Sequence, residues 1–290
     1  MNYTTLITAV QLQSLMASGA PLMVFDCSFD LMQAQAGDQQ FLERRIVGAV
    51  RANLDRHLSA QPGRGRSSGG RHPLPTPQDC AAWLARTGFH HHMQAVVYDR
   101  QGTTFCARLW WMLKWLGHDA VAVLDGGLPA WQAMGGALNS GEATPLAPGQ
   151  FVAKTPRATL VTSAQVLAAL GSAAQTVLDA RAGPRYRGEV EPLDPIAGHI
   201  PGALNRPFGD NFQQDGRFKD RQTLHAEFSS LLGGRDPSGV VHQCGSGVTA
   251  TPNMLAMELA GLGASALYAG SWSEWCSDTT RPVARGSEQA

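Results

Sequence analysis

At 290 residues the chain is longer than a single hydrophobic core usually supports, so we expect two domains. Hydrophobic residues make up 43% of the chain and charged residues 16%, which is the balance of an ordinary soluble globular protein. Its 23 basic and 23 acidic residues give no net charge that would attract nucleic acid, and no apolar run is long enough to span a membrane. The N-terminal residues lack the pattern of a signal peptide, so we expect a cytoplasmic protein.

In the first half, short apolar runs alternate with helical patterns. The predicted buried strands are residues 22–25, 95–98 and 120–124, and the predicted helices are residues 78–86 and 106–116. Residues 61–73 are rich in glycine, proline, serine and arginine without an apolar period, which predicts a surface insertion. Residues 141–157 are rich in Gly, Pro, Ala and Thr, which is typical of a linker.

The second half repeats this order of elements. Its predicted strands are residues 176–178, 239–242 and 266–268, and its predicted helices are residues 163–170 and 250–262. Equivalent residues of the two halves are Asp26 and Asp179, Gly48 and Gly202, Asp99 and Cys244, and Trp131 and Trp275. The repeat predicts an α/β protein of two tandem domains, each a parallel sheet flanked by helices. We place these domains at residues 1–140 and 158–290, on either side of the linker 141–157.

Cys244 lies where a predicted strand meets a glycine-bearing loop and then a helix. Backbone N–H groups and a helix N-terminus can converge on a sulfur in such a loop and favour the thiolate, which is the nucleophilic form. The alternative is a buried structural cysteine in a strand-to-helix turn. We expect the other four cysteines to be structural, since none is at such a loop; they are Cys27, Cys80, Cys106 and Cys276.

The segment Cys244-Gly245-Ser246-Gly247-Val248-Thr249 resembles the active-site loop of the rhodanese superfamily, in its 3-mercaptopyruvate sulfurtransferase branch. Further resemblances lie at residues 110–111, 124–131, 177–181 and 198–205, so together they extend over nearly the whole chain. The resemblance implies two rhodanese-like domains, of which only the second is catalytic, because Asp99 stands in the first where Cys244 stands in the second.

The same resemblance implies roles for the loop and for residues outside it. Sulfur would pass through a persulfide on Cys244, surrounded by the loop residues that bind the substrate, namely Gly245, Gly247, Val248 and Thr249. Neutral Gly245 and Ser246 stand where thiosulfate-directed relatives carry basic residues, which favours 3-mercaptopyruvate as the donor. The Ser246 hydroxyl would help to protonate the departing pyruvate enolate; the alternative is a serine that only caps the turn.

In the family, an aspartate and a histidine from the first domain relay to this serine, and they match Asp55 and His72. For His72, an exposed loop histidine is the alternative. Arg185 matches an arginine that binds the substrate carboxylate. A second substrate arginine of the family is missing from residues 191–195, so Arg187 is its candidate replacement. Either arginine could instead form a surface ion pair with Glu189 or Glu191.

The resulting prediction is a sulfurtransferase that takes sulfur from a small donor, releases pyruvate, and delivers the sulfur to cyanide or to a thiol such as thioredoxin or glutathione. It implies no cofactor and no metal; the adjacent histidines 90–92 lack the companions of a metal site. Two alternatives stay open, a thiosulfate sulfurtransferase and a non-catalytic rhodanese-like sulfur-sensing module. Ala250 argues strongly against a cysteine phosphatase, because the loop of that class needs an arginine at this position.

Overall fold

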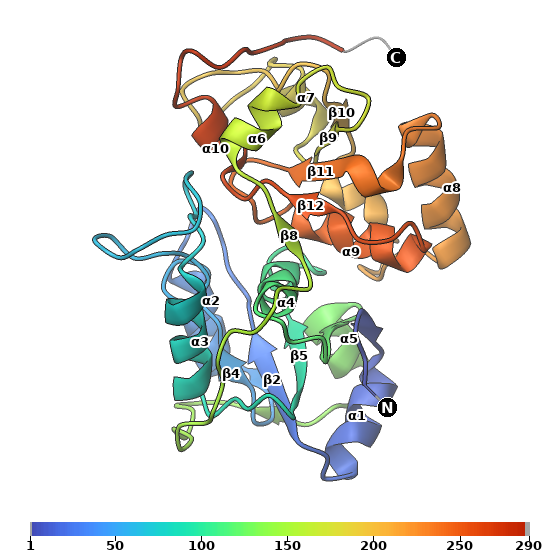
Figure 1. The fold of residues 1–290 in the computed structure, drawn as a ribbon. Coiled ribbons are helices and arrows are strands. Elements are labelled where there is room, and N and C mark those ends of the chain that lie inside the picture. The colour runs from blue at the N-terminus through green and yellow to red at the C-terminus, as the bar shows by residue number, and fades with distance from the viewer. Residues whose placement is uncertain (1, 288–290) are drawn as a thin grey trace. The chain divides into compact units, whose positions relative to one another are not determined.

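The structure, a computed structural model, describes residues 2–287 (Figure 1). Contacts divide it into two compact units, which we call the first and second units. The first unit comprises the residues up to 65, residues 75–157 and residues 212–218; the second comprises residues 66–74, 158–211 and those from 219 onward. Each half of the sequence therefore contributes one short segment to the other half's unit. The predicted linker, residues 141–157, lies within the first unit.

The first unit contains a parallel five-stranded sheet in the order β1-β6-β5-β2-β4. Its strands are β1 (Leu6–Ile7), β2 (Leu22–Asp26), β4 (Val50–Arg51), β5 (Gln94–Tyr98) and β6 (Val121–Leu124). Its helices are α1 (Ala9–Ala17), α2 (Ala36–Glu43), α3 (Pro77–Arg86), α4 (Cys106–Trp115) and α5 (Gly127–Ala133). A small antiparallel pair joins β3 (Arg45–Ile46) to β7 (Leu138–Asn139).

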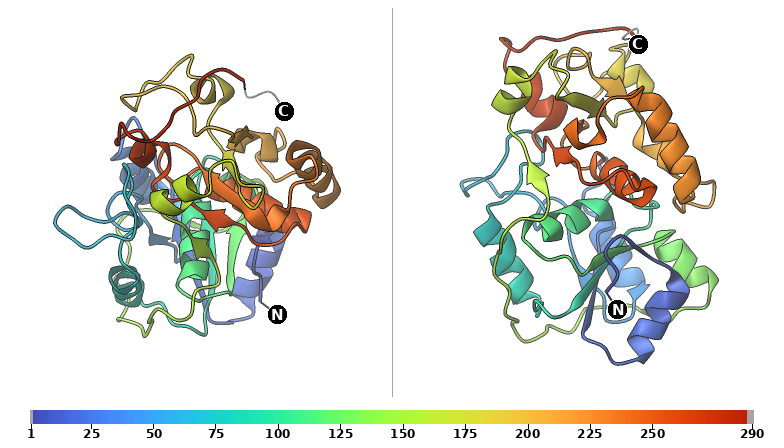
Figure 2. Two further views of the ribbon diagram at one scale, coloured as in Figure 1. Left: turned by 45° about the horizontal axis from the view of Figure 1, so that its top comes forward. Right: turned by 45° about the vertical axis from the view of Figure 1, so that its right-hand side comes forward.

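The second unit contains a parallel five-stranded sheet in the order β10-β9-β11-β12-β8. Its strands are β8 (Thr159–Leu160), β9 (Thr176–Asp179), β10 (Leu204–Asn205), β11 (Val240–Gln243) and β12 (Ala266–Leu267). Its helices are α6 (Ser163–Ala168), α7 (Gly183–Tyr186), α8 (Arg221–Leu232), α9 (Thr251–Ala260) and α10 (Ser271–Trp275). Figures 1 and 2 show α8 and α9 packed side by side. Two parallel sheets flanked by helices confirm the predicted fold class.

Local sequence signals begin the equivalent helices of the two units in the same way. Thr8 caps α1 and Thr162 caps α6, and each forms a capping box with the glutamine three residues later. Gly261, with a φ of 76°, ends α9 in the left-handed conformation that glycine adopts without steric cost. Helix α9, which follows the loop after β11, therefore ends at a defined residue.

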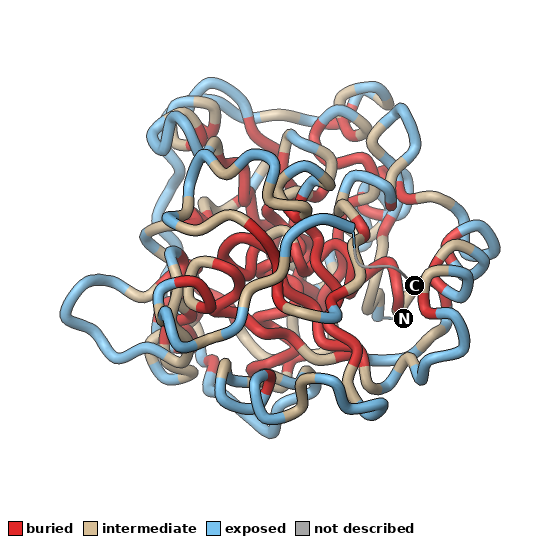
Figure 3. The backbone as a smooth tube through the Cα atoms, turned by 90° about the horizontal axis from the view of Figure 1, so that it is seen from above, coloured by how far each residue is buried: buried red, intermediate tan, exposed pale blue. Residues whose placement is uncertain are grey.

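Each unit has its own hydrophobic core. Trp131 lies in the core of the first unit and its repeat equivalent Trp275 in that of the second, with 2% and 0% of their surfaces exposed. Figure 3 shows buried residues gathered in the interior and exposed residues along the outer loops. Both faces of each sheet are covered, which explains why the strands are apolar runs rather than alternating patterns. Among residues 2–287, no helix is both long and apolar enough to cross a membrane.

His242, in the central strand β11, makes the folded state sensitive to acid. It is fully buried, and burial lowers its pKa to about 3, whereas the unfolded chain has a histidine pKa of about 6.5. Between these values the unfolded chain binds a proton that the folded chain excludes. Stability is therefore complete above about pH 6.5 and falls, as the pH drops toward about 3, by about 1.4 kcal/mol per pH unit.

Urea unfolding at about pH 7, 6 and 5 should show this slope, and His242→Val should reduce it by about 1.4 kcal/mol per unit. Carboxylates contribute to acid sensitivity in both proteins, so the difference between the two slopes isolates the histidine. Equal slopes in the two proteins would show that this imidazole does not control the transition.

Candidate active site

Cys244 directly follows the central strand of the second sheet and precedes helix α9. Parallel pairing sets Gln243 of β11 beside Asp179 of β9, so the loops that follow these two strands leave the same edge of the sheet. Ligands of open α/β sheets bind at this edge, outside the carboxyl ends of the strands. Only 1% of the surface of Cys244 is exposed, so its sulfur is enclosed by the loops around it.

Two features hold the loop after Cys244 in a tight curl. Gly247 has a φ of 74°, and a Cβ atom there would collide with the carbonyl oxygen of Ala269. The carbonyl oxygens of Cys244 and Gly245 accept hydrogen bonds from the N–H groups of Trp272 and Ser273, at 3.0 and 2.9 Å. The loop is therefore fastened to the start of α10 before any substrate arrives.

Ser271 occupies a backbone conformation that only glycine adopts easily. Its φ is 55°, and its repeat equivalent in the first unit is Gly127, with a φ of 56°. The Ser271 hydroxyl accepts the N–H of Cys244 at 3.1 Å and donates to the carbonyl of Tyr268 at 2.9 Å. A serine in place of the expected glycine costs about 1 kcal/mol of backbone strain, and here its hydroxyl satisfies the N–H group of the cysteine.

The first unit shows what the equivalent loop can hold. Asp99, which stands at the position of Cys244, is fully buried and accepts four backbone N–H groups at 2.7–3.0 Å. Those groups belong to Gln101, Thr103, Phe105 and Cys106. Burial raises the pKa of Asp99, and the four hydrogen bonds oppose that shift. This curl of backbone is therefore a nest for a negatively charged group.

The equivalent loop of the second unit lacks a built-in anion, and its curl differs in part, because Thr103 has a φ of 72° and its equivalent Val248 has no positive φ. By the repeat, the N–H groups of Ser246, Val248, Ala250 and Thr251 correspond to the four that bind the Asp99 carboxylate. Thr251 donates its N–H to the carbonyl of Val248 at 3.1 Å, which leaves the other three. None of the three has a hydrogen-bond acceptor in the part of the chain that the structure describes. Ser246 and Val248 are buried, and Thr249 between Val248 and Ala250 is half-buried. The loop thus presents unused donors beside Cys244, where an anionic sulfur can accept them.

His72 lies against this loop, because residues 66–74 belong to the second unit. Its Nδ1 atom is 2.7 Å from the Ser246 hydroxyl, and both residues are 7% exposed. The neighbouring Arg71 N–H donates to the Ser273 hydroxyl at 3.0 Å, which anchors the segment next to the loop. His72 is therefore a buried partner of Ser246 rather than an exposed loop histidine.

Asp55, the third residue of the predicted relay, lies in the first unit. It is half-buried, and burial raises the pKa of its carboxyl group while Arg56 opposes the shift. Its backbone is held by Asn53, whose side-chain oxygen accepts the Asp55 N–H at 3.0 Å. Its part in a relay stays a prediction.

Three arginines and three carboxylates form an alternating network around the cysteine loop. Asp179 pairs with Arg181 at 2.6 Å, Glu191 with Arg185 at 2.6 Å, and Asp194 with Arg71 at 2.5 Å. Glu191 also contacts Arg181 at 3.4 Å, and Asp194 also contacts Arg185 at 3.3 Å, so the pairs are linked into one chain of charges.

Arg181 is the innermost of these cations. Burial disfavours its charge, but Asp179, with contributions from Glu191 and the Cys244 sulfur, raises the pKa of Arg181 above its usual value. Its guanidinium lies 4.7 Å from the centre of the Trp272 ring. A permanent positive charge thus lies close to Cys244 in a buried environment.

Arg187, predicted as a candidate substrate residue, is at the surface. It pairs with Glu189 at 2.7 Å, and the side chains of both residues are more than a third exposed. The contacts of Arg187 therefore match the alternative named above, a surface ion pair with Glu189. Arg185 is different, because it combines the pair with Glu191 with a position next to Gly245.

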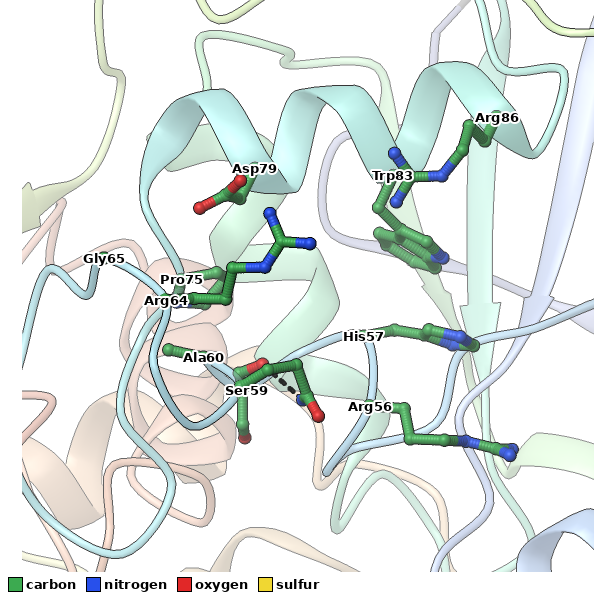
Figure 4. Close-up of a pocket in the computed structure, with 11 residues that line it drawn as sticks. Arg56, His57, Ser59, Ala60, Arg64, Gly65, Pro75, Asp79, Trp83 and Arg86 are labelled. Atoms are coloured by element: carbon green, nitrogen blue, oxygen red, sulfur yellow. Dashed lines mark hydrogen bonds between the residues drawn. The ribbon is translucent and has the colours of Figure 1, made fainter.

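The first unit has a polar cavity of its own, about 170 Å³ in volume (Figure 4). His57 stacks on Trp83 at one side, and three arginines, Arg56, Arg64 and Arg86, stand around it. Burial lowers the pKa of His57 to about 4, and its Nδ1 atom accepts the N–H of Asn53. The cavity is lined by no cysteine, so it has no nucleophile for sulfur chemistry.

The remaining cysteines and histidines do not form a second centre. All five cysteines are buried and free of disulfides, and burial raises the pKa of Cys80 to about 12, which leaves it protonated. His91 stacks on Phe151 at 4.3 Å. Within residues 2–287, no three His, Cys, Asp or Glu residues are grouped as metal ligands would be.

The sequence did not single out Arg71, Asp194 or Ser271. Arg71 could have been suspected only from its position beside His72. Asp194 is 123 residues from its partner Arg71, and no local pattern reports such a pair. For Ser271 a signal was available, because a serine stands where the first half of the repeat has Gly127.

Comparison with known proteins agrees with this geometry. The model of the rhodanese-like domain matches residues 8–134 and 162–278. The chain is 48% identical over 287 residues to a probable 3-mercaptopyruvate sulfurtransferase of Pseudomonas aeruginosa, covering 99% of this chain and 100% of that protein. It is 40% identical over 288 residues to a putative thiosulfate sulfurtransferase of Mycobacterium tuberculosis, covering 97% of each.

Among solved structures, the fold is similar to that of SseA from Escherichia coli, described as a 3-mercaptopyruvate sulfotransferase with the rhodanese fold. The TM-score is 0.80 at 30% identity, over 94% of this chain and 100% of that one. The two family matches cover both units of the repeat, and the relatives align along nearly the full chain. The chain therefore belongs to the rhodanese family and contains two rhodanese-like domains.

Proposed function

We propose that this chain is a sulfurtransferase that takes sulfur from 3-mercaptopyruvate as a persulfide on Cys244, releases pyruvate, and passes the sulfur to a thiol. The names of its relatives share sulfur transfer and differ in the donor. The acceptors we propose are cyanide in an assay, and in the cytoplasm thioredoxin or glutathione.

One observation carries the proposal. Asp99 fills the backbone nest of the first unit with its own carboxylate, whereas the nest beside Cys244 is left with unused N–H donors. A persulfide extends the cysteine by one sulfur atom and carries a negative charge. The nest supplies several hydrogen bonds to such an anion without a metal or a cofactor.

The reaction can be written with all bonds balanced. The Cys244 thiolate attacks the sulfur of 3-mercaptopyruvate, an S–S bond forms, and the S–C bond breaks with its electron pair going to carbon. The leaving group is the enolate of pyruvate, which takes one proton to become pyruvate. An acceptor thiolate then attacks the outer sulfur of the persulfide and restores the Cys244 thiolate.

The Ser246–His72 pair is suited to supply that proton. The hydroxyl two residues after the nucleophile has His72 Nδ1 at 2.7 Å, and the buried position of both excludes bulk water. Ser246 donates to the enolate and recovers a proton through the imidazole. Asp55 is the third member of the proposed relay.

Steady-state comparison of donors tests the proposal directly. Thiocyanate formation from cyanide should be faster with 3-mercaptopyruvate than with thiosulfate, and pyruvate should appear in equal amount. Mass spectrometry of the enzyme treated with donor alone should find one added sulfur, about 32 Da, on the Cys244 peptide. A donor-treated protein without this addition would remove the persulfide from the mechanism.

Ser246→Ala should slow turnover of 3-mercaptopyruvate roughly a hundredfold, because the departing enolate loses its proton donor. Thiosulfate serves as the internal comparison, since its leaving group is sulfite, which departs without being protonated. Single-turnover rates with both donors separate the two effects. Equal slowing with both would assign Ser246 to the shape of the loop instead of proton delivery.

The two alternatives differ in what they require. A thiosulfate sulfurtransferase is favoured by the guanidinium groups of Arg71 and Arg185 next to Gly245, because a dianionic donor needs positive charge there. The donor comparison decides between the two substrates. A non-catalytic sulfur-sensing module needs no nucleophile, so Cys244 beside unused N–H donors argues against it.

A further inference from the structure

We infer that Arg71 and Arg185 together bind the carboxylate of the sulfur donor, so that Arg71 replaces the second substrate arginine that residues 191–195 do not supply. The inference rests on the proposed function, since it concerns the donor of the same site. Arg71 comes from the segment 66–74, which also carries His72.

The two guanidinium groups converge on Gly245, the residue after the nucleophile. A Cβ atom built on Gly245 would lie 3.3 Å from Nη2 of Arg71 and 3.5 Å from Nη1 of Arg185. Both nitrogens therefore flank Gly245, directly next to Cys244 in the chain. A carboxylate has two oxygens and accepts charge-assisted hydrogen bonds of about 2.8 Å, so one carboxylate bound between the two guanidinium groups could accept from both arginines.

The nitrogens that face Gly245 are the ones left over by the ion pairs. Arg71 uses Nη1 toward Asp194, and Arg185 uses Nε and Nη2 toward Glu191 and Asp194. Nη2 of Arg71 and Nη1 of Arg185 have no hydrogen-bond partner among the described residues. The carboxylates therefore orient the two guanidinium groups and leave one NH₂ group of each arginine available for a ligand.

The side chains of the supporting carboxylates are buried. The side chains of Glu191 and Asp194 are each 3% exposed. Burial by itself would raise the pKa of Glu191, but hydrogen bonds and charge from Arg185 and its neighbours lower it below the usual value. A buried carboxylate that stays ionised holds its arginine in one place, which reduces the ordering that substrate binding requires.

Gly245 allows both guanidinium groups to approach the backbone of the loop closely. Its backbone does not need a positive φ, so the absence of a side chain is explained by the space and not by the conformation. An alanine at this position would set a methyl group between the two guanidinium groups. The Gly245→Ala substitution therefore tests the same binding site while both arginines stay in place.

The test measures binding of 3-mercaptopyruvate by calorimetry in the Cys244→Ser protein, which cannot take up the sulfur. Adding Arg71→Ala should weaken binding roughly tenfold to a hundredfold, the loss expected for one charge-assisted hydrogen bond. Arg185→Ala should have an effect of the same size. Arg66→Ala is the matched control, because it removes an exposed arginine of the same segment, and it should leave binding unchanged.

Kinetics of the active enzyme give a second readout. Arg71→Ala should raise KM for 3-mercaptopyruvate with a smaller effect on kcat, because the lost contact is made to the part of the donor that does not react. Loading of Cys244 from 3-mercaptopyruvate, relative to loading from inorganic polysulfide, which has no carboxylate, should fall by the same factor as binding.

Unchanged calorimetric binding in Arg71→Ala overturns the inference. If that substitution also disturbs loading from polysulfide, Gly245→Ala decides: weaker binding of the carboxylate supports the arginine pair, and unaltered binding refutes it. A parent enzyme that binds 3-mercaptopyruvate but forms no persulfide would contradict the proposed function while leaving the arginine pair in place.

Discussion

Cys244→Ser is expected to lower sulfur transfer at least about a thousandfold, to the level of the uncatalysed reaction. Serine keeps the size of the side chain, but its hydroxyl is protonated at neutral pH and is a weak nucleophile without an activating base. The unused N–H donors of the loop cannot compensate, because they stabilise an anion that no longer forms. Thiocyanate formation and the mass of the donor-treated protein measure the loss.

Cys244→Asp is the informative companion to this variant. It recreates in the second unit the arrangement of Asp99, so its carboxylate should occupy the nest. We expect it to be as inactive as Cys244→Ser but more stable, by roughly 1–3 kcal/mol in urea unfolding. Sulfur transfer that persists in both variants would place the carrier at another cysteine and refute the mechanism.

Asp99→Ala should destabilise the protein by about 3–5 kcal/mol, since it leaves four buried N–H groups without their acceptor. The loop that it holds leads into α4, whose residues are buried along its full length. The loss should therefore appear as a lower urea midpoint for the first unit. Chemical denaturation followed by circular dichroism measures it.

Asp99→Asn is the control for this prediction. It keeps the shape and one acceptor oxygen, so it should lose clearly less stability than Asp99→Ala. An alanine variant as stable as the parent protein would show that the carboxylate is not needed to hold the loop, and it would remove the internal comparison on which the anion nest of Cys244 depends.

The sequence was sufficient for most of the fold. The strands at 22–26, 94–98 and 240–243 are covered on both faces, so each is a continuous apolar run that stands out from its surroundings. The repeat supported the central strands by their equivalents in the other half, but helices α1 and α8, which are equivalent to α6 and α3, were not predicted. The edge strands β4 and β10 are only two residues long, and such short elements leave no periodicity to detect.

The part of the site that is contiguous in sequence was predictable. The nucleophile lies in a contiguous strand-loop-helix pattern, and the loop residues follow it directly in sequence. The partners of that loop are set by tertiary contacts instead. Residues 66–74 have no hydrophobic pattern that shows which unit they join, and the pairing of Arg71 with Asp194 depends on that choice.

The exchange of segments has a consequence for how the two repeats can be separated. A gene fragment starting near residue 158 would encode Cys244 and its loop but neither Arg71 nor His72. The first repeat, which has Asp99 in place of the cysteine, thus encodes side chains that contact the Cys244 loop and the start of α10 in the second. This dependence gives a duplicated ancestor a reason to retain an inactive copy in the same polypeptide.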